Sequence, residues 1–347
     1  MNVRRRLIRT SAAAGAVAFG LATLAGCPPT GSADGRSDDG KLAVVASFYP
    51  MEFLVRTIGG SHVSVSDLTE PGVEPHDLEV SPRQTAELSD AGLVVYLGGL
   101  QPAVDEAIKV AEVKDKVDAA DLTHLESHGT SSGHDHGESA GTEHDHGDEH
   151  SHGEEGHAEE DHGEEGHDHG GGNAAADPHV WLDPAKYAEI AQGVGGALEK
   201  ADPKHADAYS RNTDALVARL GRLDKAYKDG LANRTTDTFI TTHSAFGYLA
   251  ERYGLHQEGI SGIDPESEPS PARMKDLQAL AKKEKVSTVF FETIASDRTA
   301  KTLAGDIALR TDVLDPVEGI TDESQGRDYF EVMQANLRNL QKALAAT

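Results

Sequence analysis

Short apolar runs alternate with amphipathic stretches in the first half of the chain, between residues 41 and 113. The strand-like runs cover Leu42–Ser47, His62–Leu68 and Leu93–Leu97, and the helix-like stretches cover Pro50–Ile58, Pro82–Ser89 and Pro102–Glu112. Strands that alternate with helices are typical of a parallel sheet covered by helices. This half of the chain is therefore predicted to form an α/β layer.

The same alternation returns in the second half of the chain. Its strand-like runs are Thr238–Thr242, His256–Ile260, Thr288–Glu292 and Asp312–Leu314, and its helix-like stretches are Ala245–Tyr253, Pro271–Lys285, Asp297–Leu309 and Asp328–Ala346. The repeated order predicts a second α/β lobe, again built on a parallel sheet.

A single long helix is predicted between the two halves. Asp202 followed by Pro203 fits a helix start, with an N-cap residue and a proline at the first helical position. A helical pattern then continues to about Lys228, with apolar positions at Tyr209, Leu216, Leu220 and Leu223. Such a helix spans roughly 40 Å. One rigid helix that joins two α/β lobes leaves a cleft between them.

The first 26 residues have the order of a secretory signal. A positive start with arginines at positions 4, 5, 6 and 9 precedes the apolar stretch Ser11–Leu24, which is too short to span a bilayer comfortably. The run Leu24-Ala25-Gly26-Cys27 resembles the lipobox of bacterial lipoproteins, which implies lipidation of Cys27. An ordinary signal with a chance cysteine is the alternative, and Sec and twin-arginine export both stay open. Pro28–Gly40 is predicted to be a flexible tether.

The acidic balance and the single cysteine exclude several classes of protein. Lys and Arg total 32 against 59 Asp and Glu, for a formal net charge of −27. An excess of this sign repels a phosphate backbone, so we expect no nucleic-acid partner. One Cys cannot form an intrachain disulfide or a multi-cysteine zinc or iron–sulfur site. The hydrophobic fraction of 37% still suffices for a core, and 347 residues suit two lobes better than one.

Histidine is concentrated in an acidic segment over residues 124–172. Twelve of the 18 His and fifteen Asp or Glu lie between His124 and His169, without Lys or Arg, and Leu125 is the one large apolar residue. We expect a disordered loop, because almost nothing in it can be buried to offset the entropy of ordering. Imidazoles alternating with carboxylates predict weak, pH-dependent metal sites. A solubilising acidic insert is the alternative. Eight of the twelve histidines are assigned to an auxiliary weak metal loop: His134, His136, His144, His146, His150, His152, His167 and His169.

Three short motifs carry histidines outside this segment. They are Glu74-Pro75-His76-Asp77, Asp177-Pro178-His179-Val180-Trp181-Leu182-Asp183-Pro184 and Thr241-Thr242-His243-Ser244-Ala245-Phe246. Each lies in a loop or at the end of a strand, just before a predicted helix. Ligand residues of open α/β sheets gather at the carboxyl ends of strands, so we expect these three histidines to converge. The isolated His62, His205 and His256 are expected at the surface or in turns.

The three motifs resemble the signature segments of the zinc-binding proteins of metal ABC importers, the ZnuA-like cluster A-I solute-binding proteins. The resemblance covers residues 41–347 and includes the acidic His-rich insert that precedes Asp177. It implies two α/β lobes joined by a long rigid helix, with the metal site in the cleft between the lobes.

The resemblance also implies a ligand set. His76, His179 and His243 occupy the imidazole positions, and a fourth ligand comes from the segment Asp315-Pro316-Val317-Glu318-Gly319. We assign this fourth position to Glu318, with Asp315, Glu74 or a water as alternatives.

Three neutral imidazoles and one carboxylate suit tetrahedral Zn²⁺, whereas Mn²⁺ prefers more oxygen ligands and is the second candidate. Asp77, Asp177 and Asp183 are candidates to orient the imidazole N–H groups, and equally candidates for turn residues or helix caps. Trp181 and Phe246 are expected to pack beneath the loops. Glu292 is expected to cap a helix or to face the cleft.

The predicted parts are a signal peptide (1–26), a tether (27–40), an amino-terminal lobe (41–202) with the loop 124–172, a linking helix (203–230) and a carboxyl-terminal lobe (231–347). The resemblance implies a monomeric lipoprotein, anchored to the cell membrane outside the cytoplasm, that binds Zn(II) and delivers it to an ABC permease without catalysis. A manganese receptor of the same family is one alternative. A zinc hydrolase with an open water position is another, although no His-Glu-x-x-His motif supports it. A His-rich metal buffer or adhesin is the third.

Overall fold

The computed structural model describes residues 35–113, 115–128, 176–294 and 297–346. The expected signal peptide, Cys27, most of the tether and all eight histidines of the auxiliary metal loop lie outside the described residues. The described residues belong to one compact unit. Within the described ranges, no helix combines the length and the hydropathy that crossing a bilayer requires.

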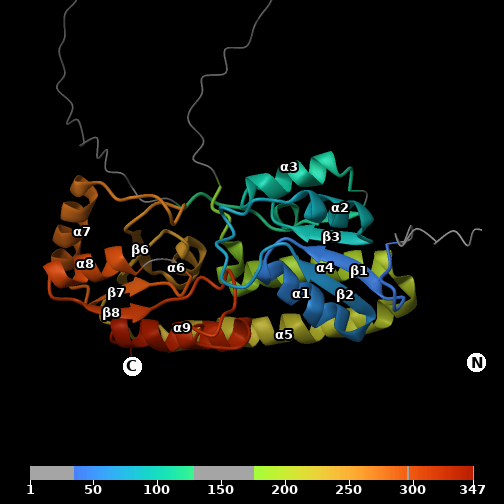
Figure 1. Cartoon of the computed structure of the whole chain (residues 1–347). Helices are drawn as coiled ribbons and strands as arrows, with labels where there is room; N and C mark the ends of the chain where they lie inside the picture. Colours follow the sequence, from blue (N-terminus) through green and yellow to red (C-terminus); the bar gives the residue numbers. More distant parts are fainter. Residues whose placement is uncertain (1–34, 114, 129–175, 295–296, 347) are drawn as a thin grey trace, which may run out of the picture. The chain divides into compact units, whose positions relative to one another are not determined.

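The first sheet has four parallel strands in the order β2-β1-β3-β4. Figure 1 labels β1, β2 and β3 of this sheet. Its strands are β1 (Leu42–Ala46), β2 (Val63–Asp67), β3 (Leu93–Tyr96) and β4 (Lys116–Asp118), and its helices are α1 (Tyr49–Gly59), α2 (Pro82–Asp90) and α3 (Pro102–Val110). The predicted strands and helices agree with these within two residues. The prediction misses β4, because three residues with one apolar side chain make no recognisable pattern.

The second sheet repeats this topology in the order β6-β5-β7-β8. Its strands are β5 (Thr238–Thr241), β6 (His256–Gly259), β7 (Thr288–Phe291) and β8 (Arg310–Val313), and its helices are α6 (Gly247–Tyr253), α7 (Pro271–Lys283), α8 (Arg298–Asp306) and α9 (Tyr329–Ala343). In both sheets the strand order reverses beside the first strand. The loops at the carboxyl ends of strands next to such a reversal are the usual ligand positions in open α/β sheets. The two-sheet α/β prediction is confirmed.

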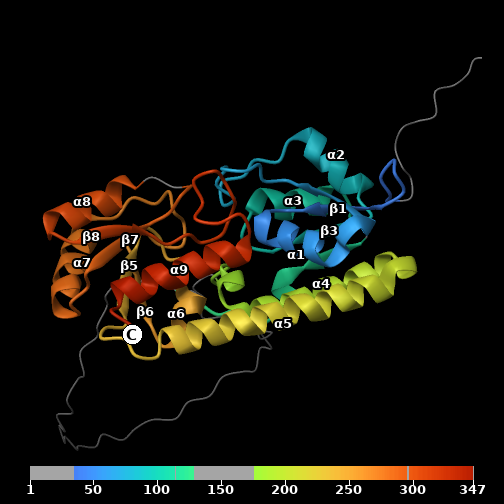
Figure 2. The ribbon, with the colours of Figure 1, turned by 90° about the horizontal axis from the view of Figure 1, so that it is seen from below.

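Two long helices, α4 (Pro184–Ala201) and α5 (Ala206–Gly230), lie between the sheets in sequence. Figure 2 shows α5 running along α4 and on towards α9, and α5 packs against both. Its 25 residues correspond to roughly 38 Å, close to the predicted length. Asp202 is the N-cap residue, as predicted, but of a short 3₁₀ turn at Pro203–His205 that leads directly into α5. Its carboxylate makes no capping hydrogen bond and accepts hydrogen bonds from Arg36 and Tyr209 instead.

One hydrophobic cluster contains buried residues from both sheets and from α5, among them Val44, Phe290 and Tyr227. The Tyr187 hydroxyl, which is buried, donates a hydrogen bond to the carbonyl of Pro50 at 2.6 Å. Because the core is continuous, it sets the positions of the loops at the ends of the two sheets relative to one another.

The first five residues of the predicted disordered loop are part of the fold. Residues 124–128 are described, and they contact the folded part of the chain. The carbonyl of Glu126 accepts a hydrogen bond from the backbone N–H of Asp177 at 2.8 Å, and the Tyr248 hydroxyl accepts one from the N–H of Glu126. The predicted start at His124 is therefore wrong by at least five residues, and residues 129–172 lie outside the described part.

Candidate metal centre

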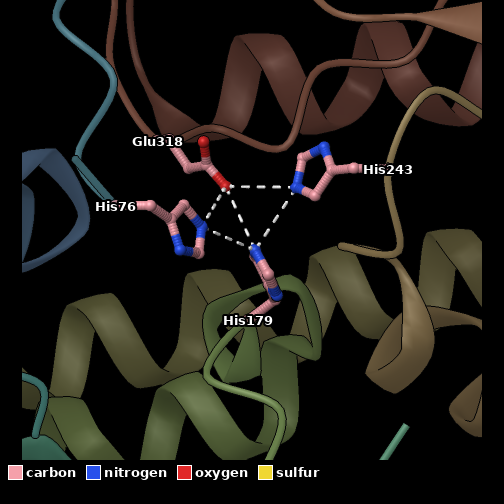
Figure 3. Close-up of side chains that lie close together, drawn as sticks. All are labelled: His76, His179, His243 and Glu318. Carbon is pink, nitrogen blue, oxygen red and sulfur yellow. Dashed lines mark hydrogen bonds and ion pairs between the residues drawn. The ribbon is translucent and has the colours of Figure 1, made fainter. Parts of the chain in front are cut away.

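Four side chains from distant parts of the sequence point at one another (Figure 3). Nε2 of His179 lies 3.3 Å from Nε2 of His76 and 3.4 Å from Nε2 of His243. Oε1 of Glu318 lies 3.2 Å from Nε2 of His179 and 3.7 Å from the Nε2 atoms of the other two histidines. The structure thus brings together the four residues that the sequence analysis assigned to a metal.

The four residues come from the ends of structural elements. His76 lies on the loop between β2 and α2, and His179 comes just before a 3₁₀ turn at Val180–Leu182 that leads into α4. His243 follows β5 by two residues, and Glu318 lies on the loop between β8 and α9. Three of the four therefore follow the carboxyl ends of parallel strands, as the topology predicts.

The cluster is closed to solvent except at His76, whose side chain is 11% exposed. The side chains of His179, His243 and Glu318 are fully buried. Neither carboxylate oxygen of Glu318 has a hydrogen-bond partner of adequate geometry. An uncompensated buried carboxylate is costly, so a cation held between it and the imidazoles would remove a large penalty.

The spacing of the four ligand atoms fits a tetrahedral metal ion. A tetrahedron with metal–nitrogen distances of about 2.0–2.1 Å has edges of about 3.3–3.4 Å. Five of the six distances between the ligand atoms run from 3.2 to 3.7 Å, and the sixth, between His76 and His243, is within 4.8 Å. Three nitrogens and one oxygen in this geometry suit Zn²⁺ better than Mn²⁺, which favours six oxygen-rich ligands.

Carboxylates hold two of the three imidazoles in place through Nδ1. The Nδ1–H of His179 donates to Oδ1 of Asp177 at 2.7 Å, and the Nδ1–H of His243 donates to Oε1 of Glu292 at 2.6 Å. These bonds leave both Nε2 atoms free to face the centre of the cluster, and they raise the basicity of the rings as ligands. Asp177 is thus an orienting residue, one of the two roles considered for it. Glu292 faces the cluster rather than capping a helix.

The other candidate residues have structural roles. Asp183 caps α4 by accepting from the N–H of Ala185 at 2.7 Å, and Asp77 is exposed. The buried Trp181 ring lies 5.3 Å from the His179 ring, between centroids, as expected for a packing residue. Phe246 is buried in the core beside Phe239.

The turn that carries Glu318 is held by Asp315, which was an alternative ligand. Asp315 accepts hydrogen bonds from the N–H of Val317 at 2.7 Å and from Thr293 at 3.0 Å, so its carboxylate is occupied. Asn336 bonds both backbone groups of Asp315, and Trp181 donates to the carbonyl of Pro316 at 2.7 Å. These bonds maintain Val317 at a φ of 61°, a left-handed conformation that a β-branched residue rarely adopts.

The pKa values of Glu318 and of Glu74, the other alternative for the fourth ligand, are shifted in opposite directions. Burial alone would raise the pKa of Glu318, but the three imidazoles that face its Oε1 at 3.2 to 3.7 Å hold that pKa well below its usual range. Burial and the charge of Glu318 raise the pKa of Glu74 to about 8, and Glu74 accepts a bond from the N–H of His76. At neutral pH Glu318 is therefore the charged carboxylate of the cluster.

The same contacts act on the histidines. Burial lowers the pKa of His179 and of His243, but the carboxylates that face each ring outweigh this effect. The pKa of His179 is raised, and that of His243 is raised well above its usual value. Because these pKa values are raised, a metal ion has to compete with protons for the two rings.

The remaining histidines of the folded part lie away from the cluster. His62 stacks on His205 with ring centroids 3.9 Å apart, and His256 is exposed. The sequence analysis missed a separate role for His128, which it counted within the acidic segment. Its ring bonds to Asp177 and Glu251. The sequence held one signal for this role. His128 lies near the start of the acidic segment and Asp177 follows its end, so the two residues flank the same segment.

Known proteins with similar sequences and structures take part in zinc uptake. Residues 44–343 match the family model described as zinc-uptake complex component A, periplasmic. The zinc-binding lipoprotein AdcA of Streptococcus pneumoniae is 33% identical over 310 residues, which are 88% of this chain and 56% of that protein. The chain thus spans about half the length of the streptococcal relatives it matches.

Two further relatives match along nearly their whole length. The high-affinity zinc uptake system protein ZnuA of Bacillus subtilis is 37% identical, with 90% of each chain covered. The crystal structure of the Zn(II)-bound ZnuA-like domain of the pneumococcal AdcA superposes with a TM-score of 0.66 at 30% identity. That match covers 88% of this chain and 99% of that domain.

Proposed function

This chain belongs to the ZnuA family of periplasmic zinc-uptake components, and on that basis we propose that it captures Zn²⁺ outside the cytoplasm for delivery to an ABC permease. The observation that carries this proposal is the buried His76–His179–His243–Glu318 cluster, with four ligand atoms at tetrahedral spacing and a carboxylate that lacks hydrogen-bond partners. A cation bound among these four side chains would offset the cost of burying the Glu318 carboxylate.

Binding without catalysis is the mode that the ligand set favours. Zinc enzymes use three protein ligands and keep a fourth position open for water. Here Glu318 occupies that position, and three of the four side chains are fully buried. The cluster therefore suits an ion that is carried rather than one that activates a water. The family is likewise one of solute-binding transport proteins.

We propose that the protein is a monomer, anchored to the outer side of the cell membrane as a lipoprotein. Relatives include proteins named as lipoproteins, which supports a location outside the cytoplasm. Cys27 is the proposed point of lipidation, after removal of residues 1–26 and with 27–40 as tether. Residues 41–202, 203–230 and 231–347 are the proposed amino-terminal lobe, linking helix and carboxyl-terminal lobe.

Calorimetric titration with Zn²⁺ tests the proposal on a variant that lacks residues 129–172. The deletion starts after His128 because residues 124–128 contact the fold. Tight one-to-one binding that is lost in His179→Ala supports a receptor with its site in the fold. If removal of the acidic segment abolishes tight binding, the chain is a His-rich metal buffer instead.

Competition separates zinc from manganese on the same protein. We expect Zn²⁺ to displace Mn²⁺ at equal concentration, because imidazole ligands bind Zn²⁺ more tightly than Mn²⁺. Displacement of zinc by manganese would make the chain a manganese receptor. Zinc-dependent hydrolysis of an ester or a peptide by the wild-type protein would support the alternative that the chain is a zinc hydrolase.

A further inference from the structure

A second group of metal-ligating side chains lies outside the cluster. Glu126, His128 and Glu251 each offer a ligand atom, and these atoms all lie within 4.8 Å of one another. Nε2 of His128 is 2.7 Å from Oε2 of Glu251 and 3.9 Å from Oε2 of Glu126. One imidazole nitrogen therefore faces two carboxylates.

The other nitrogen of His128 has a fixed partner. Its Nδ1–H donates to Oδ2 of Asp177 at 3.0 Å, and Asp177 is fully buried. A carboxylate on Nδ1 leaves Nε2 as the metal-binding nitrogen, which is the arrangement that His179 and His243 show in the first cluster. The His128 ring also packs edge-on against Tyr248, with centroids 4.4 Å apart.

Asp177 is shared between the two groups. Its Oδ1 accepts from Nδ1 of His179 and its Oδ2 accepts from Nδ1 of His128. One buried carboxylate therefore orients a ligand of the first cluster and the imidazole of the second group.

The second group is open to solvent where the first cluster is closed. The side chain of Glu251 is 59% exposed, and that of His128 is 18% exposed. A cavity of about 330 Å³ is lined by His128 and Glu251, together with His256 and Glu258. This cavity lies against His128 and Glu251, so two of the three residues border open space. Lys186 pairs with Oε1 of Glu126 at 2.7 Å, while Oε2 of Glu126 faces Nε2 of His128 at 3.9 Å.

We propose that Glu126, His128 and Glu251 form a second, surface-accessible zinc site that shares Asp177 with the buried cluster. Three protein ligands leave one position of a tetrahedral ion for water, as in an open zinc site. The two carboxylates balance the charge of the ion. This site goes beyond the proposed function and does not depend on it, since its ligands are distinct from the four buried residues.

Anomalous diffraction from crystals of the full chain, grown with Zn²⁺, tests the proposal. Data collected on both sides of the zinc absorption edge should show a peak between Glu126, His128 and Glu251, separate from a peak at the buried cluster. The peak at the second site should disappear in Glu251→Ala, while the peak at the buried cluster remains. Zinc in the buried cluster alone, or a second peak that persists in Glu251→Ala, would overturn the proposal.

A count of bound zinc in solution provides an independent measurement. Equilibrium dialysis of the full chain at saturating Zn²⁺ should give one ion fewer for Glu251→Ala and for His128→Ala than for the wild type. Ions held elsewhere are common to all three proteins and cancel in the difference. Glu106→Gln, an exposed residue on α3, is the matched control and should leave the count unchanged. Equal counts in the wild type and both site variants would contradict the second site.

Discussion

Oε1 of Glu292 lies 2.6 Å from Nδ1 of His243, and both side chains are buried. The Thr242 hydroxyl donates to the same oxygen, so the carboxylate itself is held in place. Glu292 comes from the end of β7 and His243 from beyond β5, which are neighbouring strands of one sheet. Strand pairing thus places the orienting carboxylate beside the ring that it orients.

Replacing Glu292 with Gln should weaken zinc binding by about 10–100-fold, because the neutral amide orients the His243 ring less firmly and no longer raises its basicity. Competition titration against a chelator of known zinc affinity measures the change. Glu199→Gln on α4 is the control and should bind zinc as the wild type does. An unchanged affinity in Glu292→Gln would remove Glu292 from the metal site.

Truncation of a ligand should have a larger effect than loss of its orienting partner. His243→Ala and His76→Ala are each expected to weaken zinc binding by more than about 100-fold, since one of four coordinate bonds is lost. His256→Ala, which removes an exposed histidine on β6, is the control. The same titration checks all three, and equal affinities of His76→Ala and His256→Ala would exclude His76 from the ligand set.

Zinc binding should weaken as the pH falls. The raised pKa values of His179 and His243 mean that protons compete with zinc even above the ordinary histidine range near pH 6.5. Displacement of two protons predicts a fall in affinity of up to about 100-fold per pH unit. Titrations between pH 6 and 9 measure the slope, and an affinity independent of pH would contradict imidazole ligation.

The metal-free protein should become less stable as the pH rises. A raised histidine pKa contributes stability that is fully present below the pKa of the unfolded chain and is lost as the pH rises through the folded value. Glu318 affects stability at acid pH instead. Its pKa is lowered in the folded protein, so the stability that it contributes is lost as the pH falls through that lowered pKa. Denaturation with a chelator present should therefore show an alkaline decrease in the free energy of unfolding. Saturating zinc should remove that decrease, and a persistent decrease would assign it to other groups.

Asn336→Leu should loosen the turn that carries Glu318. The substitution leaves the buried N–H and C=O of Asp315 without their side-chain partner. Each unsatisfied group should lower the free energy of unfolding by about 1–3 kcal/mol. We expect lower stability and weaker zinc binding together. Denaturation and zinc titration measure the two effects, and Asn339→Leu, one helical turn further on α9, is the control with the smaller expected change. A loss of stability with unchanged affinity would show that the turn does not position Glu318.

Much of the fold follows from local patterns. Proline near the start of α2, α3 and α7 marks where those helices begin, and apolar strands such as β3 need only a few residues to be recognised. The strand β4 escapes prediction because pairing with β3, rather than its own composition, makes it a strand. Asp202 likewise satisfies a local rule for an N-cap, yet its carboxylate bonds to Arg36 and Tyr209, and Arg36 is distant in sequence.

The sequence by itself determined the α/β alternation and the three histidine motifs, because these depend on residues that are close along the chain. Only the tertiary structure separated Glu318 from Asp315 and Glu74 as the carboxylate that faces the imidazoles. It also placed Asp177 between His128 and His179. The direction of a buried side chain is set by hydrogen bonds and packing from segments far away in sequence, and those contacts exist only once both sheets share one core.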